Sequence, residues 1–313
     1  MNISQDNYTF CIFAMKFNDN QRENDSSQKI SLRMMIIADS GSTKTTWVLL
    51  HMETGERQTI HTSGINPFYQ GSSEILQMIR DEFDAPFYGV DEIHFYGAGC
   101  ANPSVNDTVR QALQVFFHSE TIEVSSDLMA AARSLCLHEP GIACILGTGS
   151  NSCYYNGNTI EEQVSPLGFI LGDEGSGAVL GKKLLADILK KQLPGHLIDR
   201  FFAEYPVNQA DILDNIYRKP FPNRYAAGFT RFLAEHAGEP TIRGLVVTEF
   251  QAFFSRNVLQ YTRVKELPVH FTGSIAWYFR EMLEEAATGF GLQTGRIVQA
   301  PMEGLIGYHK DLQ

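Results

Sequence analysis

The chain repeats one series of predicted elements, and this duplication constrains its fold more than any other feature of the sequence. From Met34 onward, short β-rich runs and helical periodicities follow in the order strand, strand, strand, helix, strand, helix, strand, helix. From Gly141 the same series begins again. A repeated supersecondary series indicates a duplicated unit, so the sequence predicts two α/β domains of the same kind.

The repeated elements also carry related residues. The stretches IIADSGSTKTTWVLL (36–50) and CILGTGSNSCYYN (144–156) both run from a strand into a turn of glycine, serine and threonine. EIHFYGAGCA (92–101) likewise corresponds to PVHFTGSIAW (268–277). A third pair, TIEVSSDLMAA and GRIVQAPMEGL, follows in the same order. We therefore expect two similar domains whose glycine turns face a cleft between them.

The pattern also predicts where the parts of the chain begin and end. Residues 1–33 are polar and aperiodic, which indicates a disordered tail or a mis-assigned start. Residues 34–125 are expected to form the first domain and 126–313 the second, with the last helix as a candidate to pack on the first domain. Extra residues at about 173–264 predict a helical insert in the second domain.

Each domain is predicted as βββαβαβα. Strands are expected at 34–39, 45–50, 56–62, 91–97, 120–125, 142–147, 151–155, 159–164, 268–272 and 295–299. Helices are expected at 72–83, 104–117, 127–137, 173–192, 209–218, 223–236, 241–263, 274–287 and 302–311.

Charge and cysteine content restrict the partners and the compartment. A net charge of −11 disfavours nucleic acid or an anionic membrane surface as the main partner, although backbone amides and Mg²⁺ can still hold a phosphate ligand. Five cysteines form an odd set without a C-x-x-C pair, which favours reduced thiols in the cytoplasm. No apolar run approaches the roughly 20 residues of a membrane helix.

The two glycine turns are the first candidates for a ligand site. In DSGSTKTT (39–46) and LGTGSNS (146–152), small residues between strands allow N–H groups and hydroxyls to point outward around an anion. Neither turn is a Walker A loop, because the G-x-x-x-x-G-K-[ST] pattern is absent. One such turn alone would be an ordinary hairpin, whereas two in equivalent places predict two contacts to one polyphosphate.

These stretches carry a resemblance to a known family. DSGSTKT, SSDLMAAAR, LGTGSNS, LGDEGSG and FTGSIA, together with the repeat, resemble the ribonuclease-H-like fold shared by actin, the sugar kinases and the chaperone ATPases. Within it the chain is similar to the N-acetylglucosamine kinase branch of the BadF/BadG/BcrA/BcrD-type ATPase group, over about residues 34–313. The resemblance implies an ATP- and Mg²⁺-dependent kinase that phosphorylates an amino sugar, with N-acetylglucosamine at its 6-hydroxyl as the expected substrate.

The resemblance assigns the acids of the first domain. Asp127 matches the catalytic aspartate, and it also follows a predicted strand and opens a helix of small residues. A helix cap is the alternative for Asp127. Asp39 matches the aspartate that binds Mg²⁺ through water in this family. Alternatively, Asp39 forms part of the turn and binds no metal.

The resemblance also assigns the ATP contacts. The alternatives are a solvated turn lysine for Lys44 and an ordinary strand-to-helix turn at Gly273. The expected ATP-binding residues are Gly41, Ser42, Thr43, Lys44, Thr45, Gly147, Thr148, Gly149, Ser150, Gly273 and Ser274.

For the sugar, the resemblance points to polar residues that would pair with hydroxyls. Asn66 precedes a proline and could instead be a turn residue, and Glu174 could instead stabilise the first turn of a helix. Leu167 stands before Gly168 where sugar kinases of this kind from higher organisms tend to have Trp, which puts the identity of the sugar in doubt. The expected sugar-binding residues are Asn66, Asp127, Thr148, Asn151, Gly168, Asp173 and Glu174.

Two other functions remain to be weighed. The first is a dimeric ATPase that activates a 2-hydroxyacyl-CoA dehydratase through an iron–sulfur cluster, for which Cys136, Cys144 and Cys153 would be candidate ligands. Buried strand cysteines are the alternative for these three residues. The second is a sugar-sensing regulator. Such a regulator would carry a DNA-binding helix-turn-helix, and the 33-residue tail of this chain is too short and too acidic to form one. The sequence leaves the oligomeric state open, with a homodimer through the helical insert as one expectation.

Overall fold

A computed structural model describes residues 33–41, 43–83, 89–100 and 102–311, and the predicted tail therefore lies almost wholly outside the described residues. Contacts divide the chain into unit 1, which extends to Ala130, and unit 2, from Ala131 to Asp311. The division falls inside helix α4 (Asp127–Cys136), so one helix contributes residues to both units.

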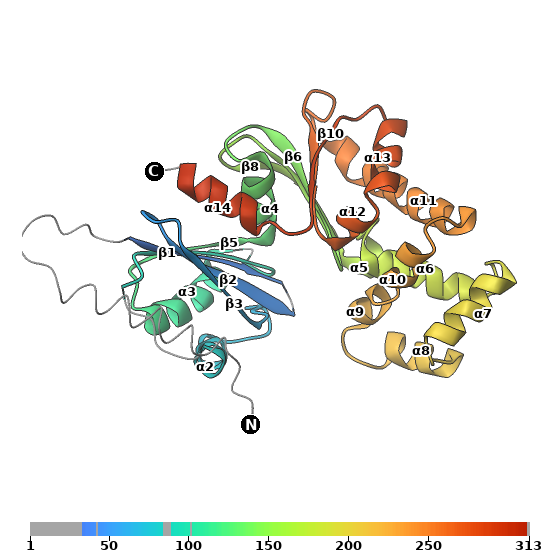
Figure 1. Cartoon of the computed structure of the whole chain (residues 1–313), viewed down its shortest axis with the longest axis horizontal. Coiled ribbons are helices and arrows are strands. Elements are labelled where there is room, and N and C mark those ends of the chain that lie inside the picture. The colour runs from blue at the N-terminus through green and yellow to red at the C-terminus, as the bar shows by residue number, and fades with distance from the viewer. Residues whose placement is uncertain (1–32, 42, 84–88, 101, 312–313) are drawn as a thin grey trace, which may run out of the picture. The chain divides into compact units, whose positions relative to one another are not determined.

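Unit 1 is built on a five-stranded mixed sheet (Figure 1). Its strands are β1 (Met34–Ser40), β2 (Lys44–His51), β3 (Arg57–Ser63), β4 (Glu92–Gly97) and β5 (Thr121–Ser126), in the spatial order β3-β2-β1-β4-β5. The first three strands are antiparallel to their sequence neighbours, whereas β1, β4 and β5 run parallel. The chain therefore makes a meander and then two crossovers, as the strand-helix alternation predicts.

The apolar residues of unit 1 explain this sheet. Strand β1 is a nearly continuous buried run, which is typical of a strand covered on both faces. The indole of Trp47 on β2 lies within 6 Å, centroid to centroid, of the rings of Phe83, Phe95 and Phe117. These rings form the core beneath α2 (Ser72–Glu82) and α3 (Pro103–Phe117), which lie on the same side of the sheet (Figure 1).

Unit 2 repeats the sheet of unit 1. Its strands are β6 (Gly141–Leu146), β7 (Ser150–Tyr155), β8 (Ile160–Val164), β9 (Val269–Thr272) and β10 (Thr294–Val298), in the order β10-β9-β6-β7-β8. Read from β8, this order and its directions match those of unit 1 strand for strand. The predicted duplication into two ribonuclease-H-like α/β units is confirmed.

The helices of unit 2 differ in detail from those predicted. The predicted helix at 173–192 begins only at Gly177, because Asp173 and Gly175 have positive φ and Ser176 caps the helix by accepting from Val179 N. The predicted helices at 223–236 and 274–287 each divide into two, and short α5 and the whole of α7 were not expected. The helices are α5 (Gly168–Leu171), α6 (Gly177–Leu189), α7 (Gly195–Glu204), α8 (Gln209–Tyr217), α9 (Pro222–Ala227), α10 (Thr230–Glu235), α11 (Pro240–Arg256), α12 (Ser274–Tyr278), α13 (Arg280–Gly289) and α14 (Met302–Asp311), with a 3-10 turn at Val258–Gln260.

The insert belongs to the core of unit 2. Leu180 and Leu184 of α6 and Phe250 of α11 are fully buried in the same apolar cluster as Phe271 of β9. Helices α7 and α8 extend away from the sheet within this unit (Figure 1). None of the helices in the described residues combines the length and apolarity that a bilayer crossing requires.

Candidate active site

Two aspartates of unit 1 lie at the carboxyl ends of its parallel strands. Asp39 is paired in register with Tyr96 of β4, and Tyr96 is paired with Ser125 of β5, so the three strands end at the same level. Asp127 follows directly after β5 as the first residue of α4. This edge is where open α/β sheets bind ligands. The structure thus brings together the two acids that the sequence assigned to metal binding and catalysis.

The Asp127 carboxylate is close enough to affect the ionisation of Asp39. Burial and, to a smaller extent, the charge of Asp127 together raise the pKa of Asp39 to about 6. Burial also raises the pKa of Asp127, although the backbone N–H groups of Leu128 and of Asp127 itself oppose the shift. In the described part of the chain, neither carboxylate forms an ion pair with a lysine, arginine or histidine. The charge of the two ionised carboxylates is therefore not neutralised by a basic side chain of the described residues.

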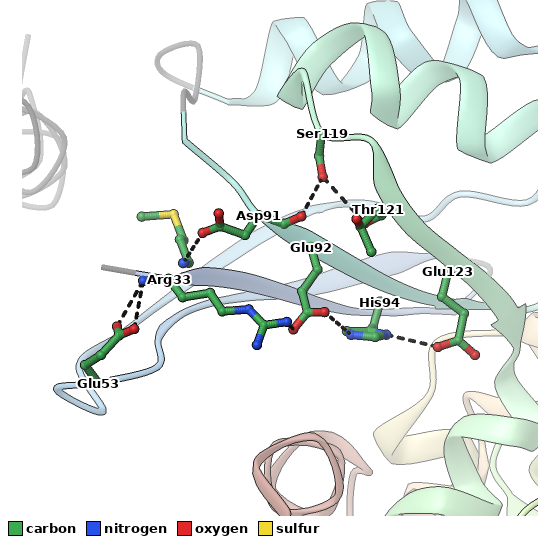
Figure 2. Close-up of polar contacts among 9 residues, drawn as sticks. Arg33, Glu53, Asp91, Glu92, His94, Ser119, Thr121 and Glu123 are labelled. Atoms are coloured by element: carbon green, nitrogen blue, oxygen red, sulfur yellow. Dashed lines mark hydrogen bonds and ion pairs between the residues drawn. The ribbon is translucent and has the colours of Figure 1, made fainter. Parts of the chain in front are cut away.

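Charged residues nearer the amino ends of the same strands are arranged differently (Figure 2). Arg33 Nη2 lies 3.1 Å from a carboxylate oxygen of Glu92, and the ring of His94 lies 3.8 Å from Glu92 and 3.0 Å from Glu123. These acids are matched by basic side chains and hold β4 and β5 together. The Asp39–Asp127 edge thus differs from this cluster in having no basic partner among the described residues.

The alternative reading of Asp127 as a helix cap is weakened by its neighbour. Ser126 Oγ accepts a hydrogen bond from Met129 N at 3.2 Å, which is the capping interaction for α4. Since Ser126 makes that bond, the Asp127 carboxylate is not required for it.

The first glycine turn is held by buried hydroxyls. Ser40 Oγ and Thr45 Oγ1 lie 2.7 Å apart, and Thr45 also donates to the carbonyl of Ser63. Ile65 N donates to Ser40 Oγ at 2.9 Å, which joins the turn to the segment after β3. Gly41, Thr43 and Lys44 are exposed, whereas Ser42 lies outside the described residues. Thr45 is fully buried and already paired, so its predicted phosphate contact is the least supported of this set.

Asn66 lies against the loop that follows β4. Its side-chain oxygen accepts from Phe68 N at 3.1 Å, and a Cβ on Gly99 would lie 2.6 Å from that oxygen. Gly99 also has φ +85°, so only glycine fits this position without strain. Cys100 lies near Asp127, and burial together with the Asp127 charge raises the pKa of its thiol to about 12. Gly99 and Cys100 were not predicted as site neighbours, although the glycine pair in FYGAGC was visible in the sequence.

The second glycine turn is held by the main chain of α6. Gly177 N donates to Gly147 O at 2.8 Å, and Ala178 N donates to Thr148 O at 3.0 Å. The first amides of α6 are thereby satisfied by the turn itself. Thr148 is exposed and Gly147 and Gly149 are half-buried, so this turn presents its surface to a ligand.

Gly273 lies directly beside this turn. A Cβ on Gly273 would overlap the carbonyl oxygen of Leu146, and its φ is +119°. Strand β9 therefore approaches the turn as closely as a glycine allows, and Ser274 begins α12 at the same point. The predicted adenosine segment and the predicted phosphate turn are brought together within unit 2.

Asp173 is held against the second turn from the other side. A Cβ on Gly149 would lie 3.0 Å from Asp173 Oδ2, and the backbone N–H of Ser150 is a hydrogen-bond donor to this carboxylate. The pKa of Asp173 is raised to about 6, mainly by burial and also by the charge of Glu174, against the opposing effects of the Ser150 hydrogen bond and Lys182. Asp173 itself has φ +56°, an uncommon conformation that a surrounding structure must enforce.

The remaining predicted sugar residues of unit 2 differ in their exposure and in how many of their polar atoms are already hydrogen-bonded. Asn151 Oδ1 accepts from Ser152 N and from Gln163 Nε2. Gly168 is exposed with φ +75°, and the Leu167 side chain before it is 61% exposed. Both carboxylate oxygens of Glu174 are occupied, by Arg256 Nε and Asn257 Nδ2. Arg256 and Asn257 were not predicted, because more than 80 residues separate them from Glu174 in the sequence.

The cysteines of the described residues do not form a cluster site. Cys144 is paired with Ser152 and Cys153 with Ala143, so the two thiols point to opposite faces of their sheet. Both are buried, and burial raises their thiol pKa values. Among the described residues no group of His, Cys, Asp or Glu side chains has the arrangement of a protein metal cluster. The geometry gives no support to an iron–sulfur site.

The fold and this pair of glycine turns define the class of protein. Two equivalent β-sheets, each with a glycine turn between its first two strands, are the actin-like ATPase fold shared with the sugar kinases. No protein-family model and no curated protein sequence matches the chain.

Solved structures place the chain in a family. A protein of Porphyromonas gingivalis, described as a proposed N-acetylglucosamine kinase, is 46% identical with a TM-score of 0.84, and the match covers 89% of this chain and 99% of that one. A proposed N-acetylglucosamine kinase of Chromobacterium violaceum is 19% identical (TM-score 0.65; 89% and 99% covered). A ROK-family glucokinase of Streptomyces griseus, solved with glucose and AMPPNP, is 15% identical (TM-score 0.54; 89% and 98% covered) and is similar in fold alone. The chain belongs to the N-acetylglucosamine kinase branch of the BadF/BadG/BcrA/BcrD-type ATPase group.

Proposed function

We propose that the chain is a cytoplasmic sugar kinase that transfers the γ-phosphoryl group of ATP to an amino sugar, with N-acetylglucosamine and its 6-hydroxyl as the expected acceptor. One observation carries the proposal: two half-buried carboxylates, Asp39 and Asp127, lie level at the ligand-binding edge of unit 1 without a cationic partner among the described residues. Membership of the kinase branch supports the same conclusion.

In this proposal Asp127 is the general base. A carboxylate whose pKa is raised by burial accepts a proton more readily than an ordinary aspartate, so Asp127 would take the proton of the sugar hydroxyl as that oxygen attacks phosphorus. The bond from the γ-phosphorus to the β,γ-bridging oxygen breaks, and ADP leaves. Positioning of the two substrates would supply most of the remaining acceleration.

The residues at this edge fit a magnesium ion. Mg²⁺ in kinases is held by one or two carboxylates together with phosphate oxygens and water, so a large protein cluster is not required. Asp39 would hold the ion, because no lysine, arginine or histidine among the described residues pairs with its carboxylate and the charge of Asp127 acts on it. When bound, the ion would neutralise charge on the β- and γ-phosphates.

The two glycine turns would hold ATP, and the polar residues beside them would hold the sugar. The exposed Gly41, Thr43 and Lys44, together with Ser42, would contact phosphate in unit 1, and the Gly147–Ser150 turn would do so in unit 2. Gly273 and Ser274 would lie against adenosine. Asn66, Thr148, Asn151, Gly168 and Asp173 would surround the sugar. A homodimer remains a prediction.

The test is ADP release with a panel of sugars under aerobic conditions, with Mg²⁺ and with excess chelator. We expect ADP release that depends on sugar and Mg²⁺, with N-acetylglucosamine giving a higher kcat/KM than glucosamine, N-acetylmuramate or glucose. Sugar-independent ATP hydrolysis, or no ADP release with any sugar, would exclude the kinase. A higher kcat/KM for another sugar would correct the acceptor and leave the reaction class intact.

A further inference from the structure

The loop Gly172–Ser176, which carries Asp173, is bound on two opposite sides. On one side the first amides of α6 donate to the carbonyls of Gly147 and Thr148, as described above. On the other side the loop extends the Glu174 side chain toward the end of α11. Within the loop, Asp173 N donates to Pro166 O and Ser176 N donates to Asp173 O, each at 3.0 Å, so the loop conformation depends on these backbone bonds together with the two attachments.

The attachment through Glu174 is made to a rigid part of the unit. Arg256 Nε donates to Glu174 Oε1, and Asn257 Nδ2 donates to Glu174 Oε2 at 3.2 Å. Asn257 is buried, and its Nδ2 also lies 3.3 Å from Phe253 O in the last turn of α11. Phe250 and Phe253 on that helix are fully buried, so its end cannot move without disturbing the core.

The same helix also fixes the backbone next to Asp173. Gly175 has φ +72°, and a Cβ there would lie 3.1 Å from Phe253 Cβ and 3.2 Å from Phe250 Cδ1. The loop therefore packs directly on α11 at Gly175, and Glu174 is bonded to the end of the same helix. Asp173 immediately precedes Glu174 in the chain, so the contacts of Glu174 and Gly175 with α11 help to hold the left-handed conformation of Asp173.

We propose that Arg256 and Asn257, acting through Glu174, position Asp173 for the sugar, and that Glu174 is a positioning residue and not a sugar ligand. This inference rests on the proposed function, in which Asp173 binds the sugar. Each oxygen of Glu174 already accepts one hydrogen bond, from an arginine and from an asparagine, and its side chain is only 15% exposed, so burial limits the approach of a ligand hydroxyl to the remaining lone pairs. The assignment adds two residues to the sugar site that the family motifs do not contain.

The location of Arg256 makes the proposal testable. Its side chain is 63% exposed, and together with Glu174, Leu167 and Leu171 it lines an open groove of about 330 Å³. A change at Arg256 removes a surface ion pair and no core contact, so the fold should persist. Arg243 provides a matched control, because it lies on the same helix and forms an exposed ion pair with Glu285 of α13.

The experiment compares Arg256→Gln, Arg256→Lys and Arg243→Gln by steady-state kinetics with the sugar and with ATP varied in turn. We expect Arg256→Gln to raise the KM for sugar about tenfold, with kcat within about twofold and the KM for ATP unchanged. Arg256→Lys should recover part of the loss, and Arg243→Gln should match the unchanged protein. Thermal unfolding of each variant should show the same midpoint within about 2 °C. Equal sugar KM values for Arg256→Gln and the unchanged protein, or an equal rise in Arg243→Gln, would overturn the proposal.

A pH profile tests the coupling between Glu174 and Asp173. The groups that act on Asp173 are Glu174, whose charge raises its pKa, and Lys182 of α6 with the Ser150 N–H, which lower it. In Glu174→Gln the acid limb of 1/KM for the sugar should therefore move to lower pH, together with a weaker affinity. An acid limb at the same pH as in the unchanged protein would show that Glu174 does not act on Asp173 and would overturn the proposal.

The two proposals fail in different ways. If the unchanged protein releases no sugar-dependent ADP, the proposed function fails, and the positioning role fails with it. If the unchanged protein is active and Arg256→Gln has the same sugar KM, only the positioning role fails.

Discussion

The two glycine turns occupy equivalent places in the duplicated sheets, yet they are held by different parts of the protein. In unit 1 the hydroxyls of Ser40 and Thr45 are buried and bonded to each other and to the backbone after β3. In unit 2 the amides of Gly177 and Ala178 bind the carbonyls of the turn directly, and glycines allow the close approach of neighbouring elements. The conformation of the first turn is therefore held by side-chain hydroxyls, whereas that of the second is held by backbone hydrogen bonds and by glycines that leave room for neighbouring elements.

The difference extends to charge. Beside the first turn lie Asp39 and Asp127, which have raised pKa values and no cationic partner in the described residues. Beside the second turn the pKa of Asp173 is also raised, but the charge of Lys182 acts on this carboxylate and opposes the shift. In the function proposed above, the reacting groups are in unit 1 and unit 2 mainly binds and orients the substrates. Three predictions test this division, from the largest expected effect to the smallest.

The largest effect is expected from Asp127→Asn in unit 1. The variant keeps the shape of the side chain and removes the proton acceptor, so kcat should fall by about 10²–10⁴-fold while the KM for sugar changes by no more than a few-fold. Steady-state kinetics with the preferred sugar measure both constants. Asp107→Asn on α3 serves as the control, because Asp107 is exposed and pairs only locally with Arg110. Turnover near that of the unchanged protein would remove Asp127 from the chemical step.

A smaller effect, on stability and ATP affinity, is expected from Gly273→Ala in unit 2. The new methyl group would overlap Leu146 O, and alanine disfavours the φ of +119° at this position, so the free energy of unfolding should fall by about 2–4 kcal/mol. The KM for ATP should rise, because the second turn must move away. Gly289→Ala is the matched control, since a Cβ at Gly289 in α13 meets no atom within 4 Å. Urea unfolding of both variants gives the comparison, and equal stabilities would contradict a close-packed second turn.

The smallest effect is expected from the charge on Asp39. Its folded pKa of about 6 lies above the ordinary value of 3.8, so this carboxyl supports the fold fully below about pH 4 and loses that contribution as pH rises through 6. Asp39→Asn should therefore be more stable than the unchanged protein at pH 8, by at most about 3 kcal/mol for a shift of roughly two units, and equal to it near pH 4.

Chemical denaturation at the two pH values measures this difference. Glu53→Gln is the control of opposite sign, because a backbone N–H from Arg33 lowers the pKa of Glu53, whose contribution is lost as pH falls. A stability gain for Asp39→Asn that does not change with pH would show that the carboxylate is not strained by burial.

The sequence predicted the sheets better than the insert, and the reason is physical. The strands of both units are short buried runs between turn residues, and duplication meant that each was seen twice. In the insert, the apolar spacing of the helix at 173–192 continued back through residues 173–176, where positive φ at Asp173 and Gly175 prevents a helix. Helix α7, which begins after Pro194, was not predicted at all. Periodicity reports which face of a helix is buried, but it does not report where tertiary contacts force a turn.

The site divides along a similar line. Asp39, Asp127 and both glycine turns were predicted because their residues are adjacent in the chain and follow strands. Gly99, Arg256 and Asn257 were not, because each acts through a partner that is distant in the sequence. The fold supplies these neighbours: the glycine pair in FYGAGC was visible at Gly99, but its contact with Asn66 was not, and no local motif indicates Arg256 or Asn257.

The matched strand order of the two units has a consequence for stoichiometry. A gene that doubled within one chain began with two copies of every functional position, so an ancestor of this protein could have had two reacting centres. When the strands are matched by their pairing, with Tyr96 of β4 equivalent to Thr272 of β9, Asp39 corresponds to Ile145 and Asp127 to Ala300, so the second copy retains neither acid. We therefore expect each polypeptide to bind one ATP and to transfer one phosphoryl group per turnover, although its sheet occurs twice.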